Sequence, residues 1–276
     1  MIKLENYEVV GWEHAIRGMR NPKNSWDRSD SPINKECDYY VDCEGCPGYE
    51  NDEICDKMIE DNVYLIGPND HKLMMQLAAG GPVHAKYRRM IAVYVDITAP
   101  LYWWKEFDTY KVGTVSDSCS TMHKIHDKEF TLEDFSHEHL LDDGDNENVP
   151  LMVDPNDYEN AFSPVNIFVL TVRMLNACRA KFIDIDNKLK KDISQEKIIE
   201  LTKVKKELWW QMIQLLPSSY NQRRTIMLNY EVLTGMYHDR KNHKLDEWRT
   251  FCEWIESLPY SEIITGEQKD EEMQKI

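Results

Sequence analysis

Residues 91–123 decide the fold, and they read IAVYVDITAPLYWWKEFDTYKVGTVSDSCSTMH. Aliphatic residues occupy every second position of 91–97, which is the period of a strand with one buried face. Pro100 follows, and Pro is favoured at the first position of a helix, so we expect a helix over the aromatic residues 100–110. The remainder, 111–123, is rich in small hydroxylated residues, which predicts either a loop that contacts a ligand or plain turns that bond their own backbone.

Helical patterns dominate the rest of the chain. A turn at 67–70 predicts the start of a helix, and the Gly-Gly pair at 80–81 predicts its end. A short amphipathic segment covers 12–19. Further segments have apolar residues at helical spacing, namely 163–189, 195–216, 227–240 and 246–258. The sequence therefore predicts an α+β protein with long helices and a helix-rich C-terminal half.

Length and composition favour one elaborated domain. The chain has 276 residues, enough for a sizeable core, and we expect the domain to span 1–265. Two polar segments interrupt the regular pattern, a cysteine-rich insertion at 21–60 and an acidic connection at 131–160. The charged tail 266–276 lacks a hydrophobic face and is expected to fray.

Charge and hydropathy disfavour several classes of partner. A net charge of −16 opposes binding to a nucleic-acid backbone, which depends on clustered Lys and Arg. No apolar run reaches the roughly 20 residues needed to cross a bilayer, and the first residues lack the basic and apolar regions of a secretory signal. We therefore expect a soluble, cytoplasmic protein with reduced thiols and with neither a nucleic-acid nor a membrane partner.

The order of strand, Ala-Pro step, aromatic helix and hydroxyl-rich segment resembles the flavin-dependent thymidylate synthases. The signature of that family is Arg-His-Arg-x-x-Ser-x-Asn-Glu-x-Ser-x-Arg-Tyr, and it aligns with residues 109–122 without one identical position. The chemically related positions are Lys111 for a cation, Thr114 for a hydroxyl, Asp117 for a carboxylate and Cys119 for a small polar atom. The resemblance implies the fold of that family, with a mixed sheet and long helices.

Several substitutions alter the chemistry of the signature. Two arginines that flank it, and that help to anchor phosphate groups in the family, fall on Thr109 and Thr121. Thr lacks the guanidinium fork that can bind a phosphate at two points. The family's Gln on the aromatic helix falls on Glu106, so that an amide that donates and accepts becomes an anion that only accepts. The resemblance is therefore stronger for the fold than for the reaction.

A second segment supports the resemblance. Leu216-Pro217 precedes a helical pattern that contains Asn229 and Arg240, and the spacing of these two residues matches the family pattern without a gap. In the family this Arg places the nucleotide, which implies the same role for Arg240. A cation near the end of a helix also stabilises the helix dipole, so both interpretations stay open. Two further cations follow as candidate phosphate partners, Lys241 and His243.

The resemblance also implies a reaction and a set of site residues. The reaction is reductive methylation of deoxyuridylate, with a folate carbon donor and hydride from reduced FAD, in a site shared by the subunits of a homotetramer. The catalytic residue is then Arg240. The substrate-binding residues are Glu106, Asp117, Cys119, Ser120, Thr121 and Arg240, and the cofactor-binding residues are Lys111, Thr114, Ser116, Asp117 and Asn229.

Alternatives to this enzyme stay open. The chain could modify deoxyuridylate or deoxycytidylate in another way, or it could be a non-catalytic descendant that acts as a nucleotide sensor or a protein-interaction factor. Relatives of thymidylate enzymes are common in phage genomes, so a phage-encoded protein is one expectation. Cys119 could instead be a nucleophile if a nearby cation promotes loss of its proton, from His123, Lys124 or His126.

Two further groups are candidates for ligand binding. His84, Arg88 and Arg89 precede the strand and either contribute to an anion pocket or are solvated residues of a turn. Four cysteines cluster in the polar insertion, with one C-x2-C step, and they suit a structural zinc site better than disulfides in a reducing compartment. The alternatives are an iron–sulfur cluster, unligated thiols or disulfides, and the residues concerned are Cys37, Cys43, Cys46 and Cys55.

Overall fold

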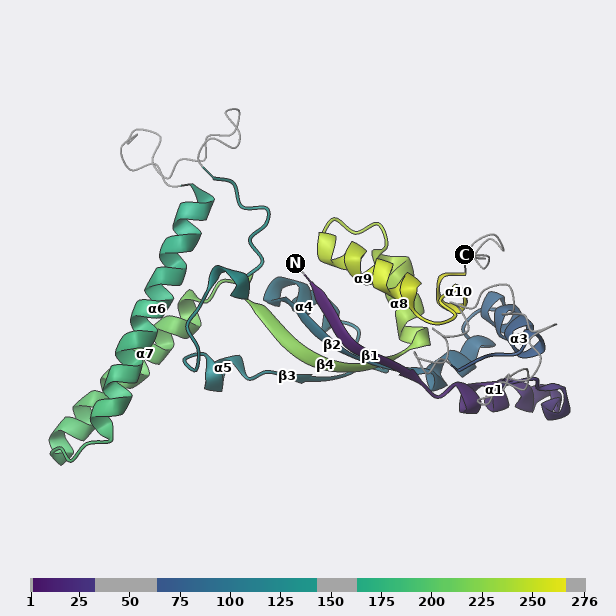
Figure 1. Cartoon of the computed structure of the whole chain (residues 1–276), viewed down its shortest axis with the longest axis horizontal. Coiled ribbons are helices and arrows are strands. Elements are labelled where there is room, and N and C mark those ends of the chain that lie inside the picture. The colour runs from purple at the N-terminus through teal and green to yellow at the C-terminus, as the bar shows by residue number, and fades with distance from the viewer. Residues whose placement is uncertain (1, 33–63, 143–162, 267–276) are drawn as a thin grey trace, which may run out of the picture. The chain divides into compact units, whose positions relative to one another are not determined.

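The computed structural model describes residues 2–32, 64–142 and 163–266 (Figure 1). The chain divides into two compact units, which are described separately. Unit 1 consists of Met1–Lys3, Thr98–Thr109 and Ser118–Arg224. Unit 2 consists of Leu4–Ile97, Tyr110–Asp117 and Thr225–Ile276. The single domain over 1–265 stays a prediction.

One four-stranded sheet has the strand order β1-β2-β4-β3. Its strands are β1 (Lys3–Val10), β2 (Ala92–Pro100), β3 (Val115–Ser118) and β4 (Asn221–Asn229). The two central strands run antiparallel, because the amide of Tyr230 bonds Ile91 O in unit 2 while the amide of Leu101 bonds Tyr220 O in unit 1. The predicted α+β class is confirmed, and the sheet is antiparallel where a mixed sheet was expected.

The helices of unit 2 pack mainly against one another, and α9 also contacts strand β1. They are α1 (Trp12–Arg20), α3 (Pro68–Ala79), α8 (Tyr230–Arg240), α9 (Asp246–Ser257) and α10 (Glu262–Thr265), with the 3-10 helices η1 (Asn21–Lys23), η2 (Trp26–Arg28) and η3 (Ala85–Met90). The ring of Trp12 in α1 lies 5.3 Å from the rings of both Tyr230 and Tyr260. Tyr7 of β1 contacts Trp254 of α9 edge to face. The amphipathic opening and the helices at 67–80 and 246–258 are thus confirmed.

A buried ion pair holds α1 to α3 within unit 2. Arg20 Nε lies 2.5 Å from Asp70 Oδ1, and both side chains are almost fully buried. Burial by itself would raise the pKa of the Asp70 carboxyl, but hydrogen bonds from Ser31, Ser29 and Arg20 outweigh it and keep that pKa below its usual value. Removing either partner would leave an uncompensated charge in the core.

Unit 1 is built around a helical hairpin. Its helices are α4 (Leu101–Phe107), α5 (Thr121–Lys124), α6 (Pro164–Leu189) and α7 (Gln195–Leu215), with the 3-10 helix η4 (Leu132–Asp134). Ser163 and Ser194 cap α6 and α7 by accepting bonds from backbone amides, as expected for N-cap Ser. The hairpin packs a cluster of buried residues that includes Phe135, Phe168, Leu175 and Met212. Phe135 comes from the segment predicted to be a solvated connection, so part of that segment belongs to the core.

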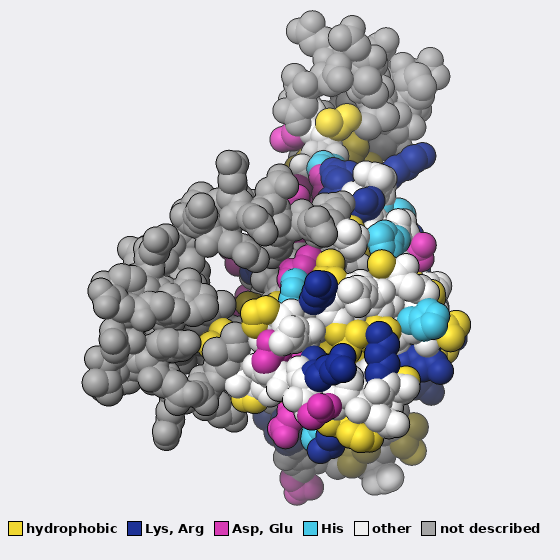
Figure 2. Space-filling view, turned by 90° about the vertical axis from the view of Figure 1, so that its right-hand side faces the viewer, with side chains coloured by type: hydrophobic (Ala, Val, Ile, Leu, Met, Phe, Trp, Pro, Cys, Tyr) yellow, Lys and Arg dark blue, Asp and Glu magenta, His cyan; other side chains and the backbone are white. Residues whose placement is uncertain are grey.

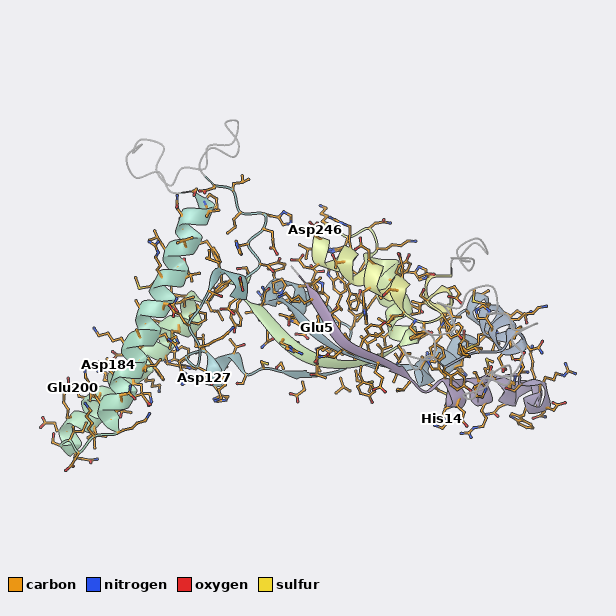
Figure 3. All side chains as sticks on the ribbon, viewed as in Figure 1. Glu5, His14, Asp127, Asp184, Glu200 and Asp246 are labelled. Atoms are coloured by element: carbon orange, nitrogen blue, oxygen red, sulfur yellow. The ribbon has the colours of Figure 1, made fainter. Side chains whose placement is uncertain are left out.

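The exposed surface of the hairpin carries ion pairs. Asp184 of α6 and Glu200 of α7 are exposed (Figure 3) and pair with Lys188 and Lys197 at 2.6 and 2.7 Å. Exposed pairs of this kind contribute about 0–1 kcal/mol. Among the residues that the structure describes, no helix is long and apolar enough to span a membrane.

Two further expectations need correction. The segment 111–123 is not a continuous loop, because it contains β3 and the short helix α5. Residues 227–229 end strand β4 instead of beginning a helix, and α8 starts at Tyr230. β1 and most of β4 were not expected at all. The four clustered cysteines, most of the cysteine-rich insertion and most of the acidic connection lie outside the described residues.

Candidate functional site

The start of α8 brings together two segments that are far apart in the sequence. Asn229 caps the helix, since its Oδ1 accepts a bond of 3.1 Å from the amide of Val232. Gly113 lies against this cap with φ +79°, and a Cβ at Gly113 would approach both Asn229 Nδ2 and Val232 Cγ2 to 3.0 Å. Only Gly allows so close an approach with this backbone conformation. Gly113 therefore lies directly on the N-terminus of α8.

The other end of α8 carries Arg240 against two aromatic rings. Its Nε donates a bond of 2.9 Å to the hydroxyl of Tyr110. The guanidinium carbon lies 4.8 Å from the ring centre of Trp248 and 5.6 Å from that of Tyr110, within the range of cation–π attraction. Burial raises the pKa of Tyr110 above its usual 10.0, although the bond from Arg240 acts in the opposite direction. Arg240 is thus a partly buried cation in a fixed position.

The remaining predicted cofactor residues lie between Tyr110 and the end of β3. Lys111 is exposed, and so are Ser116 and Asp117 on β3. The hydroxyl of Thr114 is buried and has no hydrogen-bond partner among the described residues. A buried polar group without a partner costs about 1–3 kcal/mol, so a ligand that bonds this hydroxyl would be stabilised.

Three of the predicted substrate residues of unit 1, Cys119, Ser120 and Thr121, form one turn held by Gln222. The amide of Cys119 donates to Arg223 O at 3.1 Å. Gln222 Nε2 donates to Cys119 O and to Thr121 Oγ1, both at 3.0 Å. Ser120 Oγ caps α5 by accepting from the amide of His123 at 3.3 Å. The thiol of Cys119 is exposed, and the described residues provide no hydrogen bond or ion pair that would activate it as a nucleophile.

Glu106 lies on α4 in the same unit. The neighbouring Trp104 anchors this helix, because it is 1% exposed and its Nε1 donates to Gln222 O at 3.0 Å. The carboxylate of Glu106 is half-buried. Unit 1 thus holds Glu106 and the turn 119–121, while unit 2 holds the other predicted residues, Arg240, Lys111, Thr114, Ser116, Asp117 and Asn229.

Unit 2 also contains a pocket of about 460 Å³ that the sequence did not predict. Four residues of α8 line it at positions i, i+3, i+4 and i+7, which places them on one face of the helix, namely Glu231, Thr234, Gly235 and His238. Apolar side chains form other parts of the wall, from Met75, Ala78, Ala79, Pro82 and Ile264. The volume lies within the usual range for small-molecule pockets, roughly 300–1,000 Å³.

A buried arginine lines this pocket. Arg88 is 7% exposed, and its Nη1 lies 3.7 Å from Glu231 Oε2, which is longer than a charge-assisted hydrogen bond. Arg88 Nε and Glu231 Oε2 have no hydrogen-bond partner within the described part of the chain. Arg88 is therefore not a solvated turn residue, whereas His84 and Arg89 are exposed. Because Arg88 stands in a run of basic residues, no sequence pattern indicated that its side chain is buried.

The surface at this end of unit 2 is richer in basic groups than the net charge suggests. Figure 2 shows Lys and Arg side chains close to one another near the middle of this face. Exposed cations of α1, α3 and η3 include Arg17, Lys72, Lys86 and Arg89. The described residues contain no group of three or more His, Cys, Asp or Glu that could hold a metal ion, and the predicted zinc cysteines lie outside them.

Comparisons with known proteins identify the fold. No family model and no curated protein matches the sequence. A crystal structure of thymidylate synthase ThyX from Helicobacter pylori with FAD and dUMP matches with a TM-score of 0.51 at 15% identity, over 95% of this chain and 94% of that chain. A second structure of the H. pylori enzyme, described as a flavin-dependent thymidylate synthase, matches with a TM-score of 0.50 at 13% identity, over 95% of each chain. A UMP/dUMP methylase, PolB from Streptomyces cacaoi, matches with a TM-score of 0.47 at 11% identity, over 93% of this chain and 89% of that chain.

At these identities the similarity shows the fold alone. The chain has a divergent ThyX-like fold, as the strand, Ala-Pro step and aromatic helix predicted.

Proposed function

We propose that this protein binds a pyrimidine nucleotide and modifies its base in a flavin-dependent reaction, with methylation of deoxyuridylate as the first reaction to test. The observation that carries the proposal is the position of Arg240, fixed between Tyr110 and Trp248 on the helix that Asn229 caps. The ThyX-like fold supports it, since the H. pylori structures with this fold contain FAD and dUMP.

The functional group of each predicted site residue indicates the part of the nucleotide that it would contact. Arg240 and Lys111 supply cations for a phosphate or a base carbonyl, and the buried hydroxyl of Thr114 supplies a hydrogen bond. In unit 1, Glu106 and the turn 119–121 offer a carboxylate, hydroxyls and backbone groups to a pyrimidine. An ionised Glu accepts the N–H of a uracil ring but cannot donate to its carbonyls.

The flavin needs a site that suits a ring system and a pyrophosphate. The pocket in unit 2 fits an uncharged heteroaromatic ring, because its wall is largely apolar and Arg88 and Glu231 present a donor and an acceptor. The negative charge of Glu231 disfavours a phosphate there, so the phosphates belong with the exposed cations. When bound, FAD supplies the hydride of the reaction, and the protein orients the base and excludes water.

A second candidate function is nucleotide binding without catalysis. It is favoured by the motif substitutions, since no signature position in 109–122 is identical. A homotetramer remains part of the proposal for either function. The exposed strand β3, whose four residues are all accessible at the sheet edge, offers free backbone groups to a second copy.

The first experiment separates these functions. Purified protein is incubated with excess FAD and desalted, its visible spectrum is recorded, and dUMP binding is measured by calorimetry. A retained flavin band together with dUMP binding is the expected result. Binding of dUMP without flavin would replace the enzyme with the non-catalytic function, and binding of neither would overturn the proposal.

A further inference from the structure

Arg224 of β4 is held in one orientation by three different contacts, all within unit 1. Its guanidinium carbon lies 4.1 Å from the ring centre of Trp104. Its Nε donates to Gln222 Oε1 at 3.0 Å, and its Nη1 donates to Asp108 Oδ1 at 2.7 Å. Because the guanidinium is planar, these contacts fix the direction of every N–H on it. The side chain has therefore already lost most of its freedom before any ligand binds.

This arginine keeps donors for a ligand. A guanidinium has five N–H donors, and the described contacts of Arg224 use one on Nε and one on Nη1. Its Nη2 has no partner within residues 2–32, 64–142 and 163–266. The side chain is 13% exposed, whereas that of Asp108 is 51% exposed and is screened by solvent. The ion pair with Asp108 therefore orients the guanidinium of Arg224 but offsets little of its positive charge.

Gln222 links Arg224 to the predicted substrate turn. Its carbonyl oxygen accepts from Arg224 while its amide nitrogen donates to Cys119 O and Thr121 Oγ1. One side chain therefore sets the position of both the cation and the turn. The turn itself contains no cation, and neither Glu106 nor Asp108 attracts an anion.

The phosphate monoester of a nucleotide carries close to two negative charges at neutral pH, so it needs a cation near the groups that contact the rest of the molecule. Arg223 does not meet this need, because successive side chains of a strand point to opposite faces of the sheet. We propose that Arg224 binds the phosphate of the nucleotide, with Asp108 and Gln222 as positioning residues. This inference rests on the proposed nucleotide-binding function and names a phosphate-binding residue for it.

The test compares a nucleotide with its nucleoside. Dissociation constants for dUMP and for deoxyuridine are measured by calorimetry on the full chain and on three variants. Arg224→Gln is expected to weaken dUMP binding about 10- to 100-fold, the range for a hydrogen bond to a charged group, and to leave deoxyuridine binding unchanged. Arg224→Lys keeps the charge without the fork, so it should restore part of the loss. Arg223→Gln removes the same charge from the same strand and should leave both constants unchanged.

The outcomes distinguish the inference from the function on which it rests. Unchanged preference for dUMP over deoxyuridine in Arg224→Gln would overturn the role of Arg224 and leave nucleotide binding intact. An equal loss for both ligands would also overturn it, since that indicates a structural role. If the unaltered protein binds neither ligand, the proposed function and the inference both fail. Should Arg224→Gln not fold, Arg224→Lys decides, because its ion pair with Asp108 is retained and unchanged dUMP affinity would overturn the proposal.

Discussion

The two units each hold one arginine against a tryptophan, but they build this arrangement from different elements. Arg240 sits at the end of a helix, and its aromatic partners come from the segment after α4 and from α9. Arg224 sits on a strand, and its partners come from α4 and from its own strand. A helix and a strand can thus each hold a guanidinium against a buried indole ring, with polar side chains that fix its orientation.

Replacing Trp104 and Trp248 tests whether the two rings contribute equally to the stability of the fold. These changes have the largest expected effect. Trp104 is 1% exposed and Trp248 is fully buried, so each change to Ala should lower the free energy of unfolding by about 3–5 kcal/mol. Urea denaturation followed by circular dichroism measures the loss. Trp210→Ala is the control, since Trp210 is 43% exposed. A small loss of stability at only one of the two buried positions would show that the two rings are not equivalent.

Arg240→Ala tests the nucleotide role of the helix arginine. We expect dUMP binding to weaken by about 2–3 kcal/mol, which is on the order of 100-fold, because a charge-assisted contact is lost. Calorimetry measures the affinity, and circular dichroism checks that α8 and α9 stay folded. Arg173→Ala removes an exposed arginine of α6 and should change nothing. If Arg240→Ala bound dUMP with full affinity, Arg240 would have no nucleotide role, and only its interaction with the helix dipole would remain.

Gly113→Ala tests how tightly the segment 110–114 lies on α8. Both Gly113 and Gly81 have positive φ, but only at Gly113 would the new Cβ meet other atoms, at 3.0 Å. Each substitution carries backbone strain, and Gly113→Ala should cost about 1–3 kcal/mol more than Gly81→Ala because of the crowding. Thermal unfolding of the two variants gives this difference. Equal losses would show that the segment can move away from Asn229.

The smallest effect concerns the hydroxyl that anchors Arg240. Burial raises the pKa of Tyr110 above 10.0 in the folded state, so the contribution of this group is fully present below about pH 10 and is lost as pH rises through the folded pKa. Tyr110→Phe should lower stability by about 0.5–1.5 kcal/mol at neutral pH. The stability of this variant should also fall less steeply than that of the unaltered protein as the pH rises from neutral to above about 10. Urea midpoints across this range measure both, and identical slopes would contradict the shifted pKa.

Most helices could be predicted from the sequence because their signals are local. Ser163 and Ser194 cap α6 and α7 where their apolar periods begin, and the start of α9 at Asp246, labelled in Figure 3, agrees with the predicted bound. β4 was missed because its last residues join the helical pattern that follows, in which Leu228, Val232 and Met236 are spaced by four. Asn229 could have indicated the correct boundary, because Asn is a favoured N-cap residue and the helix begins just after it.

The sequence by itself determined the element order from β2 to the end of α4, the long helices and the register that places Asn229 and Arg240 at the two ends of one helix. These features depend on residues close together in the chain, so periodicity, caps and Pro positions suffice for them. Only the tertiary structure decided that Tyr110 and Trp248 enclose Arg240, that Arg88 is buried beside a pocket, and that Trp104, Asp108 and Gln222 align Arg224. Such contacts join residues distant in sequence, and burial and hydrogen-bond partners depend on which elements meet.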